Sequence, residues 1–334
     1  MVASISLSQR KLVLSEKFDQ ETNTPFFRAE TKYTYGLKKV NYPLAVTKFP
    51  ELSGTGVIVG ILDTGIDANH PDLKGKVAAF KNYINSSSTV PTDDNGHGSH
   101  VAGTIAGGNK SGTVIGFAPN VKLVIGKVFS KYGSSVDADM LKSMQWMADP
   151  DGNPATADYP KVINSSWNLD DGNMKIQNPD HEPFCIAINQ LLELGTLSVF
   201  SAGNDGPSKD SIKIPGSCPN AITVASTDES DIIANTSSRG PSVWKAVSVA
   251  KPNLAAPGVD IYSVEPGNSY KYRSGTSMAT PHVTGAVALL IQANPTKSTE
   301  EIRQLLYQGT FDLGVSGFDE SFGFGRLDIL RSLN

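Results

Sequence analysis

Four polar side chains of the kinds that nucleophilic catalysis needs are distributed along the chain, in the order Asp63, His97, Asn204 and Ser277. A serine hydroxyl becomes a nucleophile when a base takes its proton, and histidine suits that work because its ordinary pKa is near neutrality. A carboxylate can orient the imidazole, and an amide N–H can stabilise a developing oxyanion. These residue types predict hydrolysis through a covalent intermediate, provided that the fold brings them together.

Each of these residues also has a plainer interpretation when it is taken alone. Asp63 precedes Thr-Gly and could cap a turn. Ser277 precedes a long apolar stretch and could be the N-cap of a helix, a role that Thr276 could fill as well. Asn204 lies in a glycine-rich loop, where asparagine commonly supports a turn. The functional interpretation therefore depends on the combination of residues.

His97 is flanked by Gly96 and Gly98, which would let neighbouring backbone or substrate approach the imidazole closely. His100 follows three residues later, so the two histidines could present a pair of metal ligands. No HExxH pattern and no nearby cysteine pair accompanies them, and this absence disfavours a zinc site. We therefore expect His97 to be a general base.

Short β-rich apolar runs indicate how these residues are positioned. The run from Val57 to Leu62 is continuous, as in a parallel strand buried on both faces, and it ends at Asp63. Further strands are expected at 122–128, 162–164, 197–202 and 221–225, and helices at 101–106, 138–147, 186–194 and 279–292. Alternating strands and helices predict a parallel sheet with right-handed crossovers, whose carboxyl-terminal edge carries the working residues.

The composition is that of a globular chain with many turns. Of the 334 residues, 39% are hydrophobic and 19% are charged, with 31 Gly and 20 Pro. Because the formal net charge is -4, we expect neither nucleic acid nor an anionic membrane as a partner. The longest apolar runs are shorter than the roughly 18 residues of a membrane-spanning helix. Residues 1–30 lack the apolar core of a signal peptide, so any export signal is expected to have been removed.

Three motifs surround the candidate residues: Asp63-Thr64-Gly65-Ile66-Asp67, His97-Gly98-Ser99-His100-Val101-Ala102-Gly103-Thr104 and Gly275-Thr276-Ser277-Met278-Ala279-Thr280-Pro281-His282. Together with Ser201-Ala202-Gly203-Asn204, they closely resemble the subtilisin, or subtilase, family. The order Asp, His, Ser is also that of subtilisin. The similarity runs from about Tyr35 to the end of the chain.

The resemblance implies a serine endopeptidase that hydrolyses polypeptides. Carried over residue by residue, it makes Ser277 the nucleophile, His97 the base and then the acid, Asp63 the orienting acid and Asn204 the oxyanion donor. It also implies an α/β fold, a three-layer sandwich around a predominantly parallel sheet of about seven strands. The chemistry of this family needs no cofactor.

The family pattern assigns residues 35–334 to a catalytic domain and leaves 1–34 as an extension of unknown role. This polar, weakly patterned extension either wraps the domain or remains from a longer segment, and it is too short for the removable pro-domain that relatives usually need. We therefore expect a mature form. The implied substrate-binding residues are Tyr132, Gly133 and Ser134 at one edge, Ser165, Ser166, Trp167 and Asn168 on one pocket wall, Ser201, Ala202 and Gly203 on the other, and Lys213 near the pocket base.

The pocket departs from the family pattern in ways that concern specificity. Asn168 stands where a glycine commonly follows the first wall, which should narrow or polarise the entrance. Asp170 and Asp171 resemble an acidic loop of the kexin branch and favour Lys or Arg before the cleaved bond. Lys213, by contrast, favours an acidic residue before the cleaved bond.

A loop at 107–113 aligns with a calcium-binding loop of many relatives, and Asp72 matches a usual carboxylate ligand. Lys110, however, occupies a position that usually supplies an uncharged ligand. Because an ammonium group repels a divalent cation, we expect this site to be weak or absent, with Lys110 substituting for the charge of the ion. Structural calcium elsewhere in the chain stays open.

The only cysteines, Cys185 and Cys218, could form a disulfide or remain two buried thiols, and their number does not decide between these. Their positions resemble a bridge in some secreted bacterial relatives, which favours a disulfide and a secreted location over an intracellular one. The expected partners are polypeptide substrates and a cleaved pro-domain or protein inhibitor, and the expected state is a monomer.

Parts of the sequence are also compatible with two other functions. Gly54, Gly56 and Gly60 lie near a strand that is followed by an acid, as in dinucleotide-binding oxidoreductases. A Rossmann fingerprint, however, places its glycines after the first strand and its acid about 20 residues later. A non-catalytic module of the same fold is the second alternative. The presence of all four candidate catalytic residues argues against it.

Overall fold

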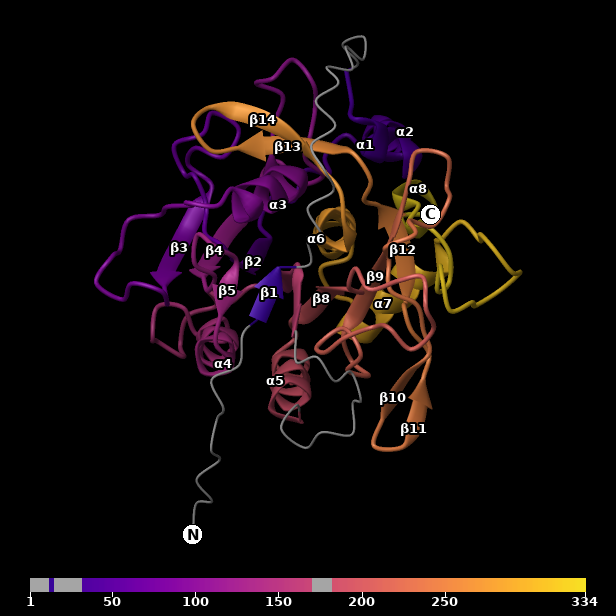
Figure 1. The fold of residues 1–334 in the computed structure, drawn as a ribbon. Coiled ribbons are helices and arrows are strands. Elements are labelled where there is room, and N and C mark those ends of the chain that lie inside the picture. Colours follow the sequence, from indigo (N-terminus) through magenta and orange to yellow (C-terminus); the bar gives the residue numbers. More distant parts are fainter. Residues whose placement is uncertain (1–11, 15–31, 170–181) are drawn as a thin grey trace.

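The computed structural model describes residues 12–14, 32–169 and 182–334. Within these residues, a sheet of seven parallel strands forms the centre of the molecule, in the order β12-β9-β8-β6-β2-β4-β3 (Figure 1). The strands are β2 (Ile58–Asp63), β3 (Val77–Asn82), β4 (Lys122–Lys127), β6 (Val162–Ser165), β8 (Leu197–Ser201), β9 (Ile222–Thr227) and β12 (Leu254–Pro257). The central strands are almost entirely buried because helices cover both faces of the sheet.

Helices pack on the two faces of this sheet and complete a three-layer sandwich (Figure 1). On one face, α3 (His97–Ala106) packs against α6 (Thr276–Ala293), which crosses β6, β8, β9 and β12. On the other face, α4 (Asp137–Trp146) and α5 (Glu182–Glu193) pack together and contact β2 and β8 respectively. The peripheral helices are α1 (Tyr35–Lys39), α2 (Tyr42–Lys48), α7 (Thr299–Gln308) and α8 (Ile329–Ser332). The predicted α/β sandwich is confirmed.

The predicted elements lie close to the observed ones, and the largest differences are at helix starts. The helix expected at 101–106 begins at His97, and the helix expected at 186–194 begins at Glu182. Two strands of the central sheet, β3 and β12, were not predicted. No helix in the described part of the chain is both long and apolar enough to cross a bilayer.

Three small sheets lie outside the central one. β10 (Ser242–Trp244) pairs with β11 (Val247–Val249), and β13 (Ile261–Glu265) pairs with β14 (Ser269–Arg273). The third sheet has the order β5-β1-β7, with β1 (Leu12–Leu14) between β5 (Ser134–Ser135) and β7 (Trp167–Leu169). A strand of the N-terminal extension therefore lies between two segments of the main domain (Figure 1).

Candidate active site

Asp63 and His97 come together at the carboxyl-terminal edge of the sheet. Asp63 is the last residue of β2, and His97 is the first residue of α3. His97 Nδ1 lies 2.7 Å from Asp63 Oδ1, and both side chains are fully buried. Because a carboxylate only accepts hydrogen bonds, Nδ1 is the donor, and the ring is held in one orientation.

A tight backbone contact makes this approach possible. A Cβ atom on Gly98 would overlap the carbonyl oxygen of Gly65, so the first turn of α3 packs directly on the loop that follows β2. Thr64 joins the same two segments, because its hydroxyl accepts a hydrogen bond from Gly98 N at 2.9 Å and donates one to Asp93 Oδ1 at 2.8 Å. The glycine beside His97 thus admits neighbouring backbone, as predicted.

Asp93 organises the turn that leads into α3. Its carboxylate accepts hydrogen bonds from the backbone N–H groups of Gly96 and Ser99, at 2.8 Å each, and from the Ser99 hydroxyl at 2.7 Å. Burial alone would raise the pKa of Asp93, but these hydrogen bonds outweigh it and hold the pKa below its ordinary value. The carboxylate therefore stays ionised where the helix begins.

Lys127 supports the same edge from the neighbouring strand. It is the last residue of β4 and lies in register with Asp63. Its buried ammonium donates to the carbonyl oxygens of Thr64, at 2.6 Å, and Phe129, at 3.2 Å, and it pairs with Asp94 Oδ1 at 2.5 Å. These contacts fix the chain on both sides of Asp63.

Ser277 lies in the first turn of α6 and contacts the loop that follows β6. Its hydroxyl donates to the carbonyl oxygen of Ser166 at 3.0 Å, and the Ser166 hydroxyl donates to the carbonyl oxygen of Ser277 at 2.9 Å. The N-cap position belongs to Gly275, with no side-chain capping bond, so neither Ser277 nor Thr276 is the cap. The plainer interpretation of Ser277 is therefore wrong.

Asn204 is fixed by the residue beside Ser277. Its Oδ1 accepts hydrogen bonds from Thr276 N at 3.1 Å and from the Thr276 hydroxyl at 3.0 Å. These two bonds hold the carbonyl end of the amide against Thr276 and so fix the plane of the amide group. A fixed amide donor of this kind is what an oxyanion hole requires.

His100 has partners different from those of His97. Its Nε2 contacts the carbonyl oxygens of Ile261 at 2.9 Å and Lys271 at 3.1 Å. Complete burial, followed by the nearby positive charge of Arg273, lowers its pKa well below the ordinary value. His100 is thus a neutral residue that ties α3 to the β13–β14 hairpin.

The predicted substrate-binding edges lie on either side of β1. Val13 pairs with Ser134 on β5 and with Asn168 on β7, and both pairings are antiparallel. Leu14 pairs with Trp167, so β1 runs toward Ser166 and Ser277. Tyr132 is 80% exposed beside this groove. Residues 12–14 thus lie in an extended conformation in the groove between β5 and β7.

Side chains from the two predicted pocket walls meet. Asn168 Nδ2 donates to the carbonyl oxygen of Ser201 at 3.0 Å, and the Ser201 hydroxyl donates to Asn168 Oδ1 at 3.3 Å. Lys213 pairs with Asp205 at 3.0 Å. Asp170 and Asp171, the basis for the predicted basic preference, lie outside the described residues.

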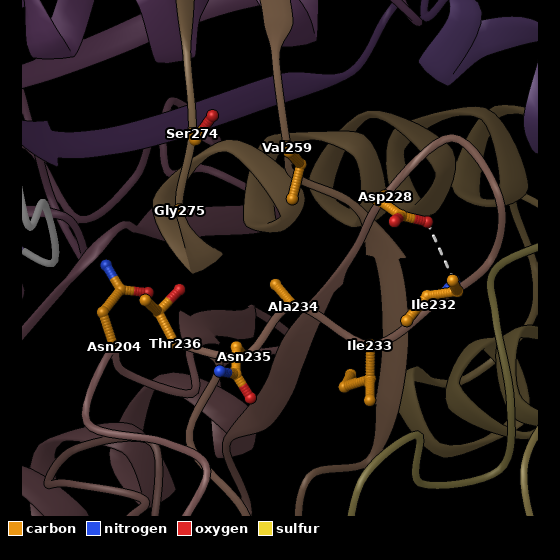
Figure 2. A pocket seen from close by; sticks show the side chains of 10 residues that line it. All are labelled: Asn204, Asp228, Ile232, Ile233, Ala234, Asn235, Thr236, Val259, Ser274 and Gly275. Carbon is orange, nitrogen blue, oxygen red and sulfur yellow. Dashed lines mark hydrogen bonds between the residues drawn. The ribbon is translucent and has the colours of Figure 1, made fainter. Parts of the chain in front are cut away.

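A cavity of about 520 Å³ opens beside Asn204 (Figure 2). Figure 2 shows Asn204 at one side of this cavity and Ile232 and Asp228 at the other, with Gly275 also on its border. Asp228 Oδ1 accepts a hydrogen bond from Ile232 N at 2.9 Å, which shapes the loop that forms the far wall. The cavity is next to the segment that leads into Ser277.

Asp72 makes hydrogen bonds with the loop that was predicted to carry a weak calcium site or none. Its Oδ1 accepts from the backbone N–H groups of Gly108 and Lys110, at 3.0 Å each. Its Oδ2 accepts from the Tyr270 hydroxyl at 2.6 Å. Burial and then the Asp72 carboxylate raise the pKa of Tyr270, so this hydroxyl remains a donor. Protein donors thus contact both oxygens of the carboxylate.

A separate group of carboxylates, from Asp149, Asp151 and Asp158, brings oxygens within 4.8 Å of one another. Thr156 donates to Asp151 within the same loop.

Cys185 on α5 forms a disulfide with Cys218, and their Cα atoms are 5.4 Å apart. The predicted bridge is therefore present. It ties α5 to the loop that precedes β9.

Several residues that shape the site were not predicted. Thr64, Asp93 and Thr276 lie within or next to the three motifs, so their position in the sequence could have identified them. By contrast, β1 consists of only three apolar residues, Leu-Val-Leu, and so short a run is easily missed because the polar sequence around it resembles a solvated tail.

Comparisons with known proteins agree with this geometry. A model described as the subtilase family matches residues 54–325. Serine protease AprX of Bacillus subtilis is 36% identical over 282 residues, which cover 78% of this chain and 62% of AprX. Bacillopeptidase F of the same organism is 36% identical over 292 residues, which cover 80% of this chain but only 20% of that protein. Subtilisin DY of Bacillus licheniformis is 35% identical over 275 residues, which cover 82% and 88% of the two chains.

Proposed function

The chain belongs to the subtilase family, and on that premise we propose that it is a serine endopeptidase whose nucleophile is Ser277. The single observation that carries the proposal is the buried Asp63–His97 hydrogen bond of 2.7 Å at the end of β2. β6 is adjacent to β2 in the sheet, and the loop after β6 contacts Ser277. This neighbourhood supports the proposal that Ser277 and the Asp63–His97 pair act together as a catalytic triad.

In the proposed mechanism, His97 Nε2 takes the proton of the Ser277 hydroxyl as that oxygen attacks the carbonyl carbon of the peptide bond. Asp63 stabilises the imidazolium that forms and stays ionised. The oxyanion of the tetrahedral intermediate accepts hydrogen bonds from the Asn204 amide and from the Ser277 N–H at the start of α6. His97 then gives its proton to the leaving amine, and water hydrolyses the acyl-enzyme by the same steps in reverse.

The proposed substrates are extended segments of polypeptides. β1 supports this proposal, because the groove between β5 and β7 pairs with three residues of backbone. Main-chain pairing of this kind tolerates many side chains. We assign residues 35–334 to the catalytic domain. We also propose that the protein acts outside the cell, because of its disulfide and of family habit, and that it is a monomer.

Active-site labelling tests the proposed nucleophile. A fluorescent fluorophosphonate should label the full chain with one molar equivalent and abolish peptide hydrolysis, and Ser277→Ala should remain unlabelled. Asp63→Asn, which keeps the shape of the side chain, should label far more slowly because the imidazole loses its charged partner. If the parent chain is not labelled, or if the Ser277→Ala variant labels as well as the parent, the assignment is wrong.

A further inference from the structure

The two walls of the predicted pocket are neighbouring strands that separate near the site. β6 and β8 are paired through Ser165 and Phe200. Beyond this point β7 turns away and pairs with β1. The space between the diverging chains is where a side chain of the substrate would enter, because the acyl carbon must lie beside Ser277 and Ser166.

The Asn168 side chain extends from β7 across this space to Ser201 at the end of β8. Its Nδ2 donates to the Ser201 carbonyl oxygen at 3.0 Å, and the Ser201 hydroxyl donates back to Oδ1 at 3.3 Å. Asn168 and Ser201 are 5% and 0% exposed, so the bridge is shielded from competing water. The Asn168 Oδ1 atom also lies 3.5 Å from the position that a Cβ on Gly203 would take. The amide therefore fills space next to the second wall.

Charged groups lie further along the same walls. Leu169 N donates to the Ile214 carbonyl oxygen at 2.9 Å, which brings the 213–214 segment against the end of β7. The Lys213 side chain is only 13% exposed and pairs with Asp205 at 3.0 Å. A long apolar side chain would have to displace the amide bridge and to contact a partly exposed ion pair, in which the Asp205 side chain is 35% exposed. Loss of the buried amide bridge is the main free-energy cost.

We infer that Asn168 is a specificity-determining residue that restricts the residue before the cleaved bond to a small side chain, such as alanine or serine. This inference rests on the proposed function, since it concerns the same site.

The test compares kcat/KM for tetrapeptide p-nitroanilides of sequence Leu-Val-Leu-X, with X as alanine, serine, leucine, phenylalanine or lysine. The parent chain should favour alanine over phenylalanine by at least about tenfold, the scale of discrimination by pocket size. Asn168→Gly should raise the phenylalanine to alanine ratio by about tenfold or more. Asn168→Ala, which is also too short to reach Ser201, should act in the same direction and serves if the glycine variant folds poorly.

Ser201→Ala is the matched control. It removes the 3.3 Å bond and leaves the bond from Asn168 Nδ2 to the Ser201 backbone, so the ratio should change by less than about threefold. The inference is overturned if the parent favours phenylalanine or lysine, or if both Asn168 variants keep the parent ratio while fluorophosphonate labelling is complete. Failure of the proposed function would appear differently, as no hydrolysis of any peptide and no labelling.

Discussion

Thr276 offers a sharp test of how Asn204, the proposed oxyanion donor, is held. Its hydroxyl donates to Asn204 Oδ1 at 3.0 Å and accepts from Gly203 N at 3.3 Å. Thr276→Val keeps the shape of the side chain and removes both bonds, while the backbone bond from Thr276 N to Asn204 Oδ1, at 3.1 Å, remains. The variant should therefore loosen the Asn204 amide without deleting it.

The expected loss can be bounded from both sides. Of the two bonds that are lost, only the one to Asn204 Oδ1 bears on the oxyanion donor directly. One buried neutral hydrogen bond is worth about 0.5–1.5 kcal/mol, which corresponds to about 2- to 13-fold in kcat if the loss falls on the transition state. Loss of the amide itself costs about 100- to 1000-fold, the size measured for the oxyanion-hole asparagine of a subtilisin. Thr276→Val should therefore lower kcat by about 2- to 13-fold and leave KM unchanged, because the oxyanion forms only after binding.

A double-mutant cycle with Asn204→Ala measures the coupling between the Thr276 hydroxyl and the Asn204 side chain. Steady-state hydrolysis of one peptide is measured for the parent, both single variants and the double variant, and Thr276→Ser is the control that keeps the hydroxyl. In the Asn204→Ala background, Thr276→Val should change kcat by less than about twofold, because its partner is gone. An equal loss of kcat in both backgrounds, or no loss in the parent background, would refute the reasoning.

Three further predictions concern stability and access, and the stability measurements use chains inactivated by Ser277→Ala. Burial lowers the pKa of His282 to about 4 from an ordinary 6.5, so the unfolded chain binds more protons between these values. The part of the free energy of unfolding that is due to His282 should therefore fall by about 3 kcal/mol as the pH drops from about 6.5 to about 4. In urea titrations, His282→Gln should make the free energy of unfolding depend less steeply on pH. An unchanged pH dependence would contradict the prediction. Replacing both Cys185 and Cys218 by serine opens a loop of sequence separation 33 and should lower the free energy of unfolding by about 3–4 kcal/mol. A reductant should lower the melting temperature of the parent chain but not that of the double variant. A chain that begins at residue 32 should show a lower KM for short peptides than the full chain, because β1 occupies the same groove; equal KM values would show that β1 does not compete.

A strand could be predicted from the sequence where its residues are uniformly buried. β2, β6 and β8 are buried along almost their whole length and are rich in Val, Ile, Leu and Phe, so their strand character is visible locally. β3 was missed because half-exposed residues interrupt its pattern, and β12 because it is short and ends in a proline. Both are strands because a neighbouring strand of the central sheet is present to pair with them.

The candidate site, too, could be predicted only in part, because some of its contacts depend on residues far apart in the sequence. The pairing of Asp63 with His97 could be expected from the motifs, whereas the bridge from Asn168 to Ser201 depends on the angle at which two strands separate. The position of β1 depends on two partners that are more than a hundred residues away in the chain. Contacts of this kind have no local signature, because the free energy that favours them comes from distant residues.

If the proposed function is correct, the position of β1 between β5 and β7 also indicates which proteins could be cut. The groove pairs with a bound segment on both sides, so a target segment must have neither edge engaged in a sheet and cannot be helical. Most segments of a folded protein fail this requirement until they open locally. The rate of cleavage of a folded target would then follow the opening equilibrium of the target rather than its amino-acid sequence. A protease of this design would act as a sensor of local unfolding, and loosely structured loops and damaged proteins would be degraded first.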